Sequence, residues 1–151
     1  METNYYIEYA KVEDIRDMLQ LWQVTPGLGI GEGDDGKSLG KFINKNPSTC
    51  LIIKSNQDIV GTVLGGFDGR RGYIYHLAVH PEHQQKGLGK LLLKNVLIEL
   101  ELVGATKVHL FVFNKNDVAL QFYLSQGWEL RRDIQIFSWN KDTLVHEICL
   151  K

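Results

Sequence analysis

The order of elements between residues 73 and 113 constrains the fold of this chain more than any other feature. Residues 73–79 and 108–113 are rich in aromatic and β-branched side chains, which predicts two strands. Between them, residues 88–102 carry leucine, valine and isoleucine at helical spacing, and Gly104 stands where a helix would stop. A strand, a helix and a strand in this order form a crossover unit, so both strands lie in one sheet and run roughly parallel.

The remaining pattern predicts further strands around this unit and helices on both faces of the sheet. Strands are expected over residues 5–10, 49–54, 59–67, 128–131, 135–139 and 144–150. Helices are expected over residues 12–23, 39–43 and 117–126, and a long glycine-rich loop covers residues 25–40. The fold class is therefore α/β, a single domain over residues 1–151, and we expect six to seven of the eight strand segments to form a mixed, mainly antiparallel sheet.

Composition narrows the class of partner. With 17 basic and 18 acidic residues, the net charge of -1 gives no global field that attracts nucleic acid or an anionic membrane surface. No run of about twenty apolar residues is present, and residues 1–6 have neither the basic start nor the apolar stretch of a signal peptide. Cys50 and Cys149 lie in apolar runs, which suits buried thiols in a reducing compartment. We therefore expect a soluble, cytoplasmic protein that binds neither nucleic acid nor membrane.

A glycine-containing turn leads into the long helix, from Gln84 to Gly89. At the start of a helix the backbone N–H groups are unpaired and the helix dipole is positive, which favours binding of a phosphate. Gly87 and Gly89 allow a ligand to approach the backbone closely, and Lys86 and Lys90 can add positive charge. The alternative is an ordinary loop with two glycines.

This turn and the residues around it resemble the GCN5-related N-acetyltransferase superfamily. The first family motif, Arg or Gln, two residues, Gly, one residue, Gly or Ala, is matched by Gln84, Gly87 and Gly89. The second motif is matched in order by Asn116, Ala119, Phe122, Tyr123, Gly127 and Trp128. Together the two motifs span about residues 73–130, and two motifs at the correct spacing are more specific than either alone.

The resemblance implies that acetyl-CoA is the cosubstrate and that no metal is needed. In this superfamily the central strand pair is splayed, here between residues 73–79 and 108–113, and the cofactor enters that gap. Backbone groups of Leu77 and Val79 pair with the pantetheine arm, and amides of residues 85–90 hold the pyrophosphate. The residues thereby assigned to cofactor binding are Leu77, Ala78, Val79, Gln84, Gln85, Lys86, Gly87, Leu88, Gly89, Lys90, Asn116, Ala119, Phe122 and Tyr123.

The same resemblance assigns a general acid but leaves the general base open. Tyr123 matches the tyrosine that protonates the departing thiolate, and its alternative is a core tyrosine beside Phe122. Many relatives carry a glutamate base at positions that correspond here to Tyr73 and Phe111, so both carboxylates are missing. His76 is the preferred replacement, because an unperturbed imidazole has a pKa of about 6.5.

Other routes for the proton stay open. A water chain to Glu32, Asp34 or Asp35 could replace a histidine base, His109 is a weaker candidate, and His76 could be a structural histidine. The residues expected to shape the acceptor site are Trp22, Glu32, Asp34, Tyr73 and Tyr75. Carboxylates there favour a cationic amine, unless the acidic loop is simply solvated.

The function expected from these residues is transfer of an acetyl group to a primary amine by direct attack in a ternary complex. The acceptor is a small molecule or a peptide, and a homodimer is possible in this superfamily. The rival is a catalytically inactive module of the same fold that binds acyl-CoA or another protein, which the missing carboxylates favour. A nucleic-acid-binding protein is a weaker rival, because the charge balance gives no basic face.

Overall fold

The computed structural model describes residues 4–141, and these fall into two compact units divided between Asn116 and Asp117. The first unit contains five strands, β1 (Tyr6–Tyr9), β2 (Cys50–Ser55), β3 (Asp58–Phe67), β4 (Gly72–Val79) and β5 (Val108–Leu110). Its helical segments are η1 (Val12–Asp14), α1 (Ile15–Gln23), α2 (Gly36–Lys45), η2 (Pro81–His83) and α3 (Leu88–Val103). The second unit contains α4 (Asp117–Ser125).

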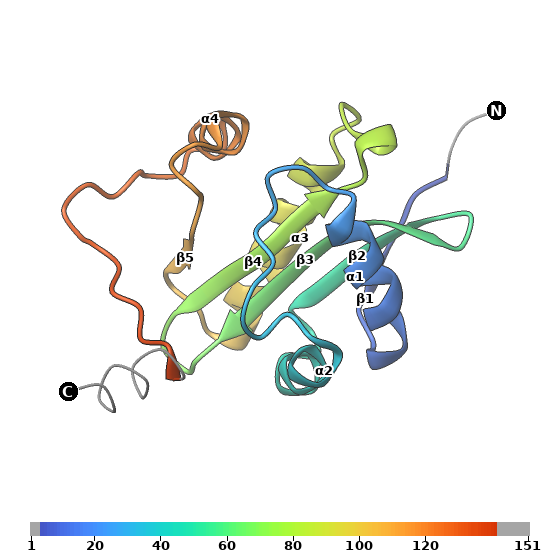
Figure 1. Ribbon diagram of the computed structural model, residues 1–151, viewed down its shortest axis with the longest axis horizontal. Coiled ribbons are helices and arrows are strands. Elements are labelled where there is room, and N and C mark those ends of the chain that lie inside the picture. Colours follow the sequence, from blue (N-terminus) through green and yellow to red (C-terminus); the bar gives the residue numbers. More distant parts are fainter. Residues whose placement is uncertain (1–3, 142–151) are drawn as a thin grey trace, which may run out of the picture. The chain divides into compact units, whose positions relative to one another are not determined.

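The five strands form one mixed sheet in the order β1-β2-β3-β4-β5 (Figure 1). The first four strands are antiparallel neighbours, and β5 pairs with β4 in parallel, as the crossover unit predicts. Pairing of β4 with β5 covers only three residue pairs and ends at Ile74 and Leu110. The rest of β4, up to Val79, continues beyond the end of β5.

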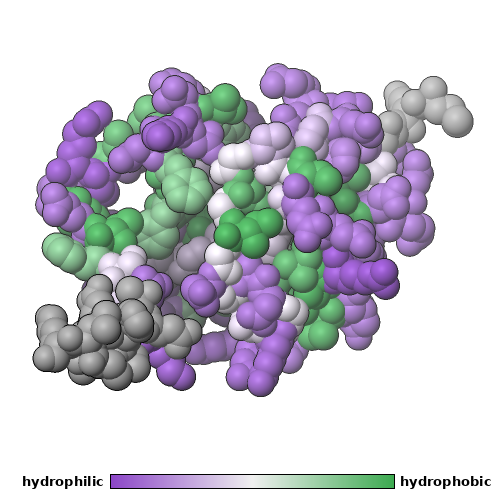
Figure 2. Space-filling model, viewed as in Figure 1, coloured by the Kyte–Doolittle hydropathy of each residue, from purple (hydrophilic) through white to green (hydrophobic). Residues whose placement is uncertain are grey.

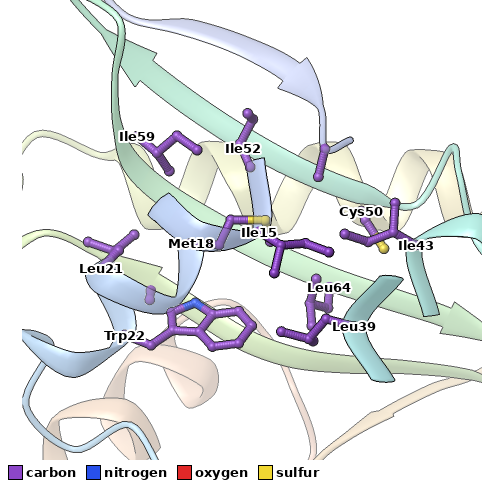
Figure 3. Close-up of a cluster of buried hydrophobic side chains, with 12 residues drawn as sticks. Ile15, Met18, Leu21, Trp22, Leu39, Ile43, Cys50, Ile52, Ile59 and Leu64 are labelled. Carbon is purple, nitrogen blue, oxygen red and sulfur yellow. The ribbon is translucent and has the colours of Figure 1, made fainter. Parts of the chain in front are cut away.

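Helices cover both faces of the sheet. A side chain at Gly61 of β3 would meet Leu92 of α3, whereas the next residue, Thr62, contacts Trp22 of α1. Successive residues of a strand point to opposite faces, so α3 lies on one face and α1 on the other. The α1 face buries a cluster that includes Met18, Trp22, Leu39, Ile43, Ile52 and Leu64 (Figure 3).

The helix after the long loop is longer than the sequence pattern predicts. It begins at Gly36 instead of residue 39, because the Asp35 side chain accepts hydrogen bonds from the backbone N–H and the hydroxyl of Ser38. An aspartate in this position satisfies an N–H group that the first turn leaves unpaired. The capping geometry therefore extends the helix over Gly36, Lys37 and Ser38, which the pattern assigned to the loop.

The prediction of six to seven strands is wrong for the residues that the structure describes. No strand forms over residues 128–131 or 135–139, and residues 144–150 lie outside the described residues. Their alternating apolar pattern resembles that of a half-buried strand, but Ile136, Phe137 and Trp139 are exposed. Alternation predicts a strand only where one face is buried and the backbone has ladder partners.

Two further expectations for the strands are also corrected. Residues 108–113 were expected to form a well-buried strand, but β5 ends at Leu110 and Phe111 and Phe113 are exposed. In β4 the simple alternation breaks, because Leu64 opposes Tyr75 while Thr62 opposes Ala78. Two residues of β4 therefore face one residue of β3, which is a β-bulge.

Candidate active site

The turn before α3 has the geometry of an anion-binding helix start. Gly87 is the N-cap of α3 with φ +78°, and Gln85 also has a positive φ of 65°. The backbone N–H of Leu91 donates to Gly87 O, which is the first hydrogen bond of the helix. The preceding N–H groups of the helix have no acceptor within it, as at any helix start.

The side chains of this turn leave the backbone accessible. Gln85, Lys86, Gly87 and Lys90 are exposed, and a Cβ at Gly87 would meet no atom within 4 Å. Leu88 is buried, so only its backbone can contact a ligand. Gln84 donates its side-chain amide to Val79 O at 3.0 Å, which ties the turn to the end of β4.

The bulge in β4 determines where His76 points. Simple strand alternation places His76, Ala78 and Ile74 on one face of the sheet. In the structure Ile74 lies on the opposite face. Ile74 pairs with Gly65, whose Cβ position faces Val96 of α3. His76 instead stacks on Trp22 of α1, with ring centroids 4.2 Å apart and an angle of 23° between the rings. Its φ of +50° is the left-handed conformation that lets the strand bulge there.

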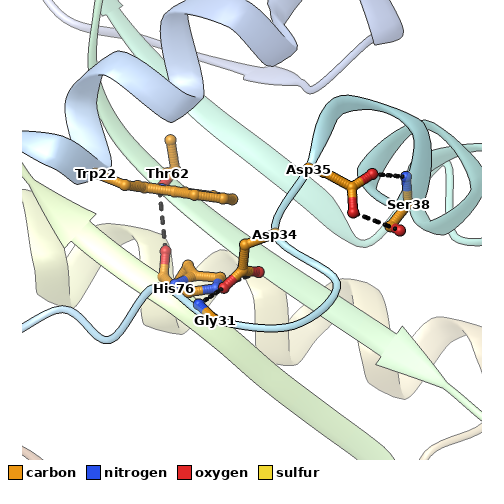
Figure 4. Close-up of polar contacts among 7 residues, drawn as sticks. All are labelled: Trp22, Gly31, Asp34, Asp35, Ser38, Thr62 and His76. Atoms are coloured by element: carbon orange, nitrogen blue, oxygen red, sulfur yellow. Dashed lines mark hydrogen bonds and ion pairs between the residues drawn. The ribbon is translucent and has the colours of Figure 1, made fainter. Parts of the chain in front are cut away.

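A closed set of contacts holds His76 in this position (Figure 4). Trp22 Nε1 donates to Thr62 Oγ1 at 2.9 Å, and Thr62 Oγ1 donates to His76 O at 3.0 Å. Trp22 and Thr62 are both buried, so these hydrogen bonds are shielded from water. Trp22, expected in the acceptor site, therefore lies beneath His76 and supports it.

The acidic loop supplies a partner for His76. His76 Nε2 lies 2.9 Å from Asp34 Oδ1, and the two side chains are 12% and 14% exposed. The other oxygen of Asp34 accepts from Gly31 N at 2.9 Å. Because an ionised carboxylate only accepts hydrogen bonds, the proton of a neutral His76 resides on Nε2 and its lone pair on Nδ1. Asp34 therefore fixes the tautomer of the imidazole.

The same loop has a second attachment near the end of the first unit. Asn116 Nδ2 donates to Gly27 O at 3.3 Å. A Cβ at Gly29 would lie 2.6 Å from the Phe113 ring, so a larger residue there would require this ring to move. An open depression of about 550 Å³ adjoins this contact and is lined by Gly27, Phe113, Asn114, Lys115 and Asn116. Residues 25–35 therefore contact β4 at one end and the segment after β5 at the other.

The remaining acceptor-site residues divide into two groups. Tyr73 and Tyr75 lie on β4 with their rings stacked and the ring centroids 6.4 Å apart. Burial raises the pKa of the Tyr75 hydroxyl, and the nearby Tyr73 hydroxyl raises it further. Glu32 is exposed in the loop, and Asp35 caps α2. Of the three acidic residues of the loop, Asp34 is the one that contacts a histidine.

In the second unit, Tyr123 lies in the middle of a small aromatic group. Its ring contacts Phe122 at 5.2 Å and Trp128 at 5.8 Å, both edge to face. Burial raises the pKa of the Tyr123 hydroxyl to about 12, so the phenol keeps its proton at neutral pH. Ala119 and Phe122 lie on the same helix and are half-buried.

Sequence reasoning missed two features of this site. Thr62 is a single hydroxyl in an apolar strand, and such a residue is a signal for a buried polar contact. The left-handed His76 has no signal in the sequence, because histidine adopts a positive φ only where tertiary contacts impose it.

Comparison with known proteins gives the family. A model of the acetyltransferase (GNAT) family matches residues 13–128. The chain belongs to the GNAT acetyltransferase family. Within residues 4–141 of this GNAT chain, no three His, Cys, Asp or Glu side chains form a group that could hold a metal ion. None of the helices in the same residues has the length and apolar character needed to cross a bilayer.

Solved structures share the GNAT fold. PaiA N-acetyltransferase from Thermoplasma acidophilum, in complex with coenzyme A, is 18% identical with a TM-score of 0.77, over 87% of this chain and 93% of that one. Naa20 from Chaetomium thermophilum, with a bisubstrate analogue, is 22% identical with a TM-score of 0.73, over 84% and 72%. The ribosomal-protein-S18-alanine N-acetyltransferase of Escherichia coli is 19% identical with a TM-score of 0.70, over 92% and 86%.

Proposed function

We propose that this chain transfers an acetyl group from acetyl-CoA to a primary amine by direct attack in a ternary complex. The observation that carries the proposal is the turn at the start of α3, with Gly87 in the left-handed conformation and its backbone exposed, in a chain of the GNAT family. The solved structure of PaiA contains coenzyme A, which supports the same class of cosubstrate here.

The residues present fit acetyl-CoA. Backbone N–H groups from Gln85 to Lys90 bind the pyrophosphate, with the helix dipole favouring its negative charge. Lys86 and Lys90 are exposed and add positive charge at the rim. The end of β4 from Leu77 to Val79 extends past β5, so its edge is available to pair with the amide groups of the pantetheine arm.

Two residues, His76 and Tyr123, carry out the proton transfers. Acetyl-CoA supplies the acetyl group as a thioester. His76 takes the proton of the attacking amine at Nδ1, while a C–N bond forms to the acetyl carbon and the C–S bond breaks. Tyr123 returns a proton to the departing thiolate of CoA. Asp34 acts through His76 as a positioning residue, since its carboxylate holds Nε2–H and stabilises the imidazolium that forms.

The acceptor is a primary amine of a small molecule or a peptide. The E. coli neighbour is an N-acetyltransferase for an alanine of a ribosomal protein, so this fold accommodates a peptide amine. Asp34 at the acceptor side supports binding of a cationic amine; the ammonium loses one proton to solvent before the attack and its second proton to His76 during it.

An acceptor screen tests the proposal. The protein is incubated with acetyl-CoA and a panel of amines, with CoA measured by chromatography and the acetylated amine by mass spectrometry. Acceptor-dependent CoA release, lost in Tyr123→Phe but kept in the exposed control Tyr6→Phe, supports the enzyme. CoA binding without release, for every amine, would instead favour the inactive acyl-CoA-binding module.

A further inference from the structure

Five aromatic side chains form a continuous strip on the α1 and α2 side of the sheet. Phe42 of α2 contacts Tyr75 at 5.9 Å between ring centroids, and Tyr75 contacts Tyr73 at 6.4 Å. Tyr73 in turn contacts His109 at 5.8 Å and Phe111 at 6.4 Å. We call this set the aromatic strip: Phe42, Tyr73, Tyr75, His109 and Phe111.

The bulge of β4 joins this strip to His76. Tyr75 pairs with Leu64, which belongs to the core cluster on the α1 and α2 side. In an unbroken strand the next residue would point to the opposite face. Because β4 bulges, His76 remains on the side of Tyr75 and stacks on Trp22. The strip therefore leads to the imidazole that we propose as the base.

The strip is apolar and partly open to solvent. Tyr75 is 37% exposed and Phe111 is 55% exposed. Figure 2 shows separate hydrophobic patches among hydrophilic residues on the face that it views. The strip contains no carboxylate, ammonium or guanidinium group. Contiguous exposed apolar surface of this kind is typical of a ligand-binding site.

The end of the strip at His76 is largely buried and carries one carboxylate, that of Asp34. Residues 25–35 contact β4 through Asp34 and the segment after β5 through Gly27. With His76 and Asp34 only 12% and 14% exposed, a slender group reaches the imidazole more easily than a branched one. One carboxylate matches one ammonium group, and further charges of a polycation would lie against uncharged rings and lose hydration.

We propose that the acceptor is a small primary amine with a single positive charge, whose unbranched carbon chain ends in an aromatic ring. The amine lies at His76 and Asp34, and the ring packs on the aromatic strip. This proposal rests on the proposed function, because it takes His76 as the place where the amine reacts. Offset-stacked and edge-to-face ring contacts favour such a ligand over an aliphatic amine of the same charge.

Three probe amines test these properties, and ethylamine, a singly charged amine without a ring, separates the ring from the charge. 2-Phenylethylamine has the ring, the single charge and the unbranched carbon; spermidine lacks the ring and carries more charges; phenylalaninamide is branched next to its nitrogen. Each is titrated calorimetrically into the protein saturated with CoA, and its kcat/KM is measured with acetyl-CoA. We expect 2-phenylethylamine to bind at least tenfold more tightly than either other amine, with the same order in kcat/KM.

A variant of the strip tests where the ring binds. Phe111 is exposed, so Phe111→Ala keeps the fold, and we expect it to weaken 2-phenylethylamine binding about tenfold while ethylamine, which has no ring, is unaffected. The control Tyr6→Ala removes an exposed aromatic ring from β1 and changes neither. Equal binding of the three probes, or equal losses in the two variants, overturns the proposal.

The two proposals fail in different ways. Turnover of spermidine or phenylalaninamide in preference to 2-phenylethylamine contradicts the acceptor class and leaves the acetyltransferase function intact. Selective binding of 2-phenylethylamine that depends on Phe111, without acetylation of any amine, supports the binding site and contradicts the acetyltransferase function.

Discussion

The side chains of Asp34 and His76 meet at 2.9 Å although 42 residues separate them in the chain. Asp34 comes from the glycine-rich loop before α2, and His76 from the bulge of β4. The pair has the geometry in which a carboxylate fixes the tautomer of a histidine and stabilises its charged form. It supports our proposal that His76 is the base in this GNAT chain, in which the resemblance places Tyr73 and Phe111 at the positions expected for a glutamate.

The base can be tested by replacing His76. We expect His76→Gln to lower kcat by about 10²-fold or more, because no group then accepts the proton of the amine. Asp34→Asn keeps an acceptor for the Nε2–H of His76 but removes the negative charge, so we expect a smaller loss of kcat than in His76→Gln.

A neighbouring carboxylate gives the control for Asp34. Asp35→Asn keeps a side-chain oxygen that can cap α2, because asparagine and aspartate are about equally good N-caps, and we expect it to leave kcat as in the wild type. Equal kcat for His76→Gln and the wild type would exclude His76 as the base.

Thr62 links the core to the site, and its replacement by valine separates stability from activity. Thr62→Val leaves the buried Trp22 N–H without an acceptor and should cost about 1–3 kcal/mol in the free energy of unfolding. Because His76 O also loses its donor, kcat falls as well. Urea denaturation and steady-state kinetics measure the two effects.

Thr49→Val is the matched control for this change. It removes a buried hydroxyl that donates to Gly65 O, away from His76. We expect a loss of about 1 kcal/mol in stability with unchanged kcat. If both variants lose kcat equally, the Trp22, Thr62 and His76 contacts have no special part in activity.

Tyr123 should act as an acid over a wide pH range. Burial raises its pKa to about 12, so the phenol stays protonated and no basic limb from this residue should arise below about pH 11. Tyr123→Phe is expected to lower kcat by about 10²–10⁴-fold. A kcat within twofold of the wild type would assign the proton donor to another group.

Cys50 gives a prediction about the core that does not depend on function. Burial raises the pKa of its thiol from 9.0 to about 12. In a Cys149→Ser background we expect no reaction with a thiol reagent at pH 8 until urea unfolds the protein.

The same shift predicts a pH dependence of stability. The folded-state pKa of Cys50 lies above the unfolded one, so its contribution to stability is fully present below pH 9 and is lost as the pH rises toward 12. The decline over this range should be smaller in Cys50→Ala. In the labelling test of the preceding paragraph, rapid reaction of Cys50 with the thiol reagent in the native protein at pH 8 would show that β2 is not a buried core strand.

The sequence predicted the parts of the fold that follow from local pattern. The crossover of β4, α3 and β5 and the antiparallel order of the earlier strands are confirmed, because periodicity and turn residues determine them. The strands expected after α4 do not form in the described residues, since apolar alternation cannot show whether a strand has a partner.

The site could be predicted only in part, for a related reason. The turn at Gly87 has its signal in adjacent residues, whereas the meeting of Asp34 with His76 depends on a loop conformation and a bulge that no local pattern encodes. The single-domain organisation, the homodimer and the role of each proposed cofactor-binding residue stay predictions.

Calorimetric titration of CoA into two matched glycine variants tests the central claim most directly. Gly87 and Gly69 both have positive φ, and a Cβ at either meets no atom within 4 Å, so replacement by leucine should cost each about 1–2 kcal/mol of stability. Only Gly87 lies in the proposed pyrophosphate turn, so Gly87→Leu should lose at least tenfold in affinity for CoA while Gly69→Leu binds like the wild type. Equal affinities in the two variants would contradict our account of how this chain binds its cosubstrate.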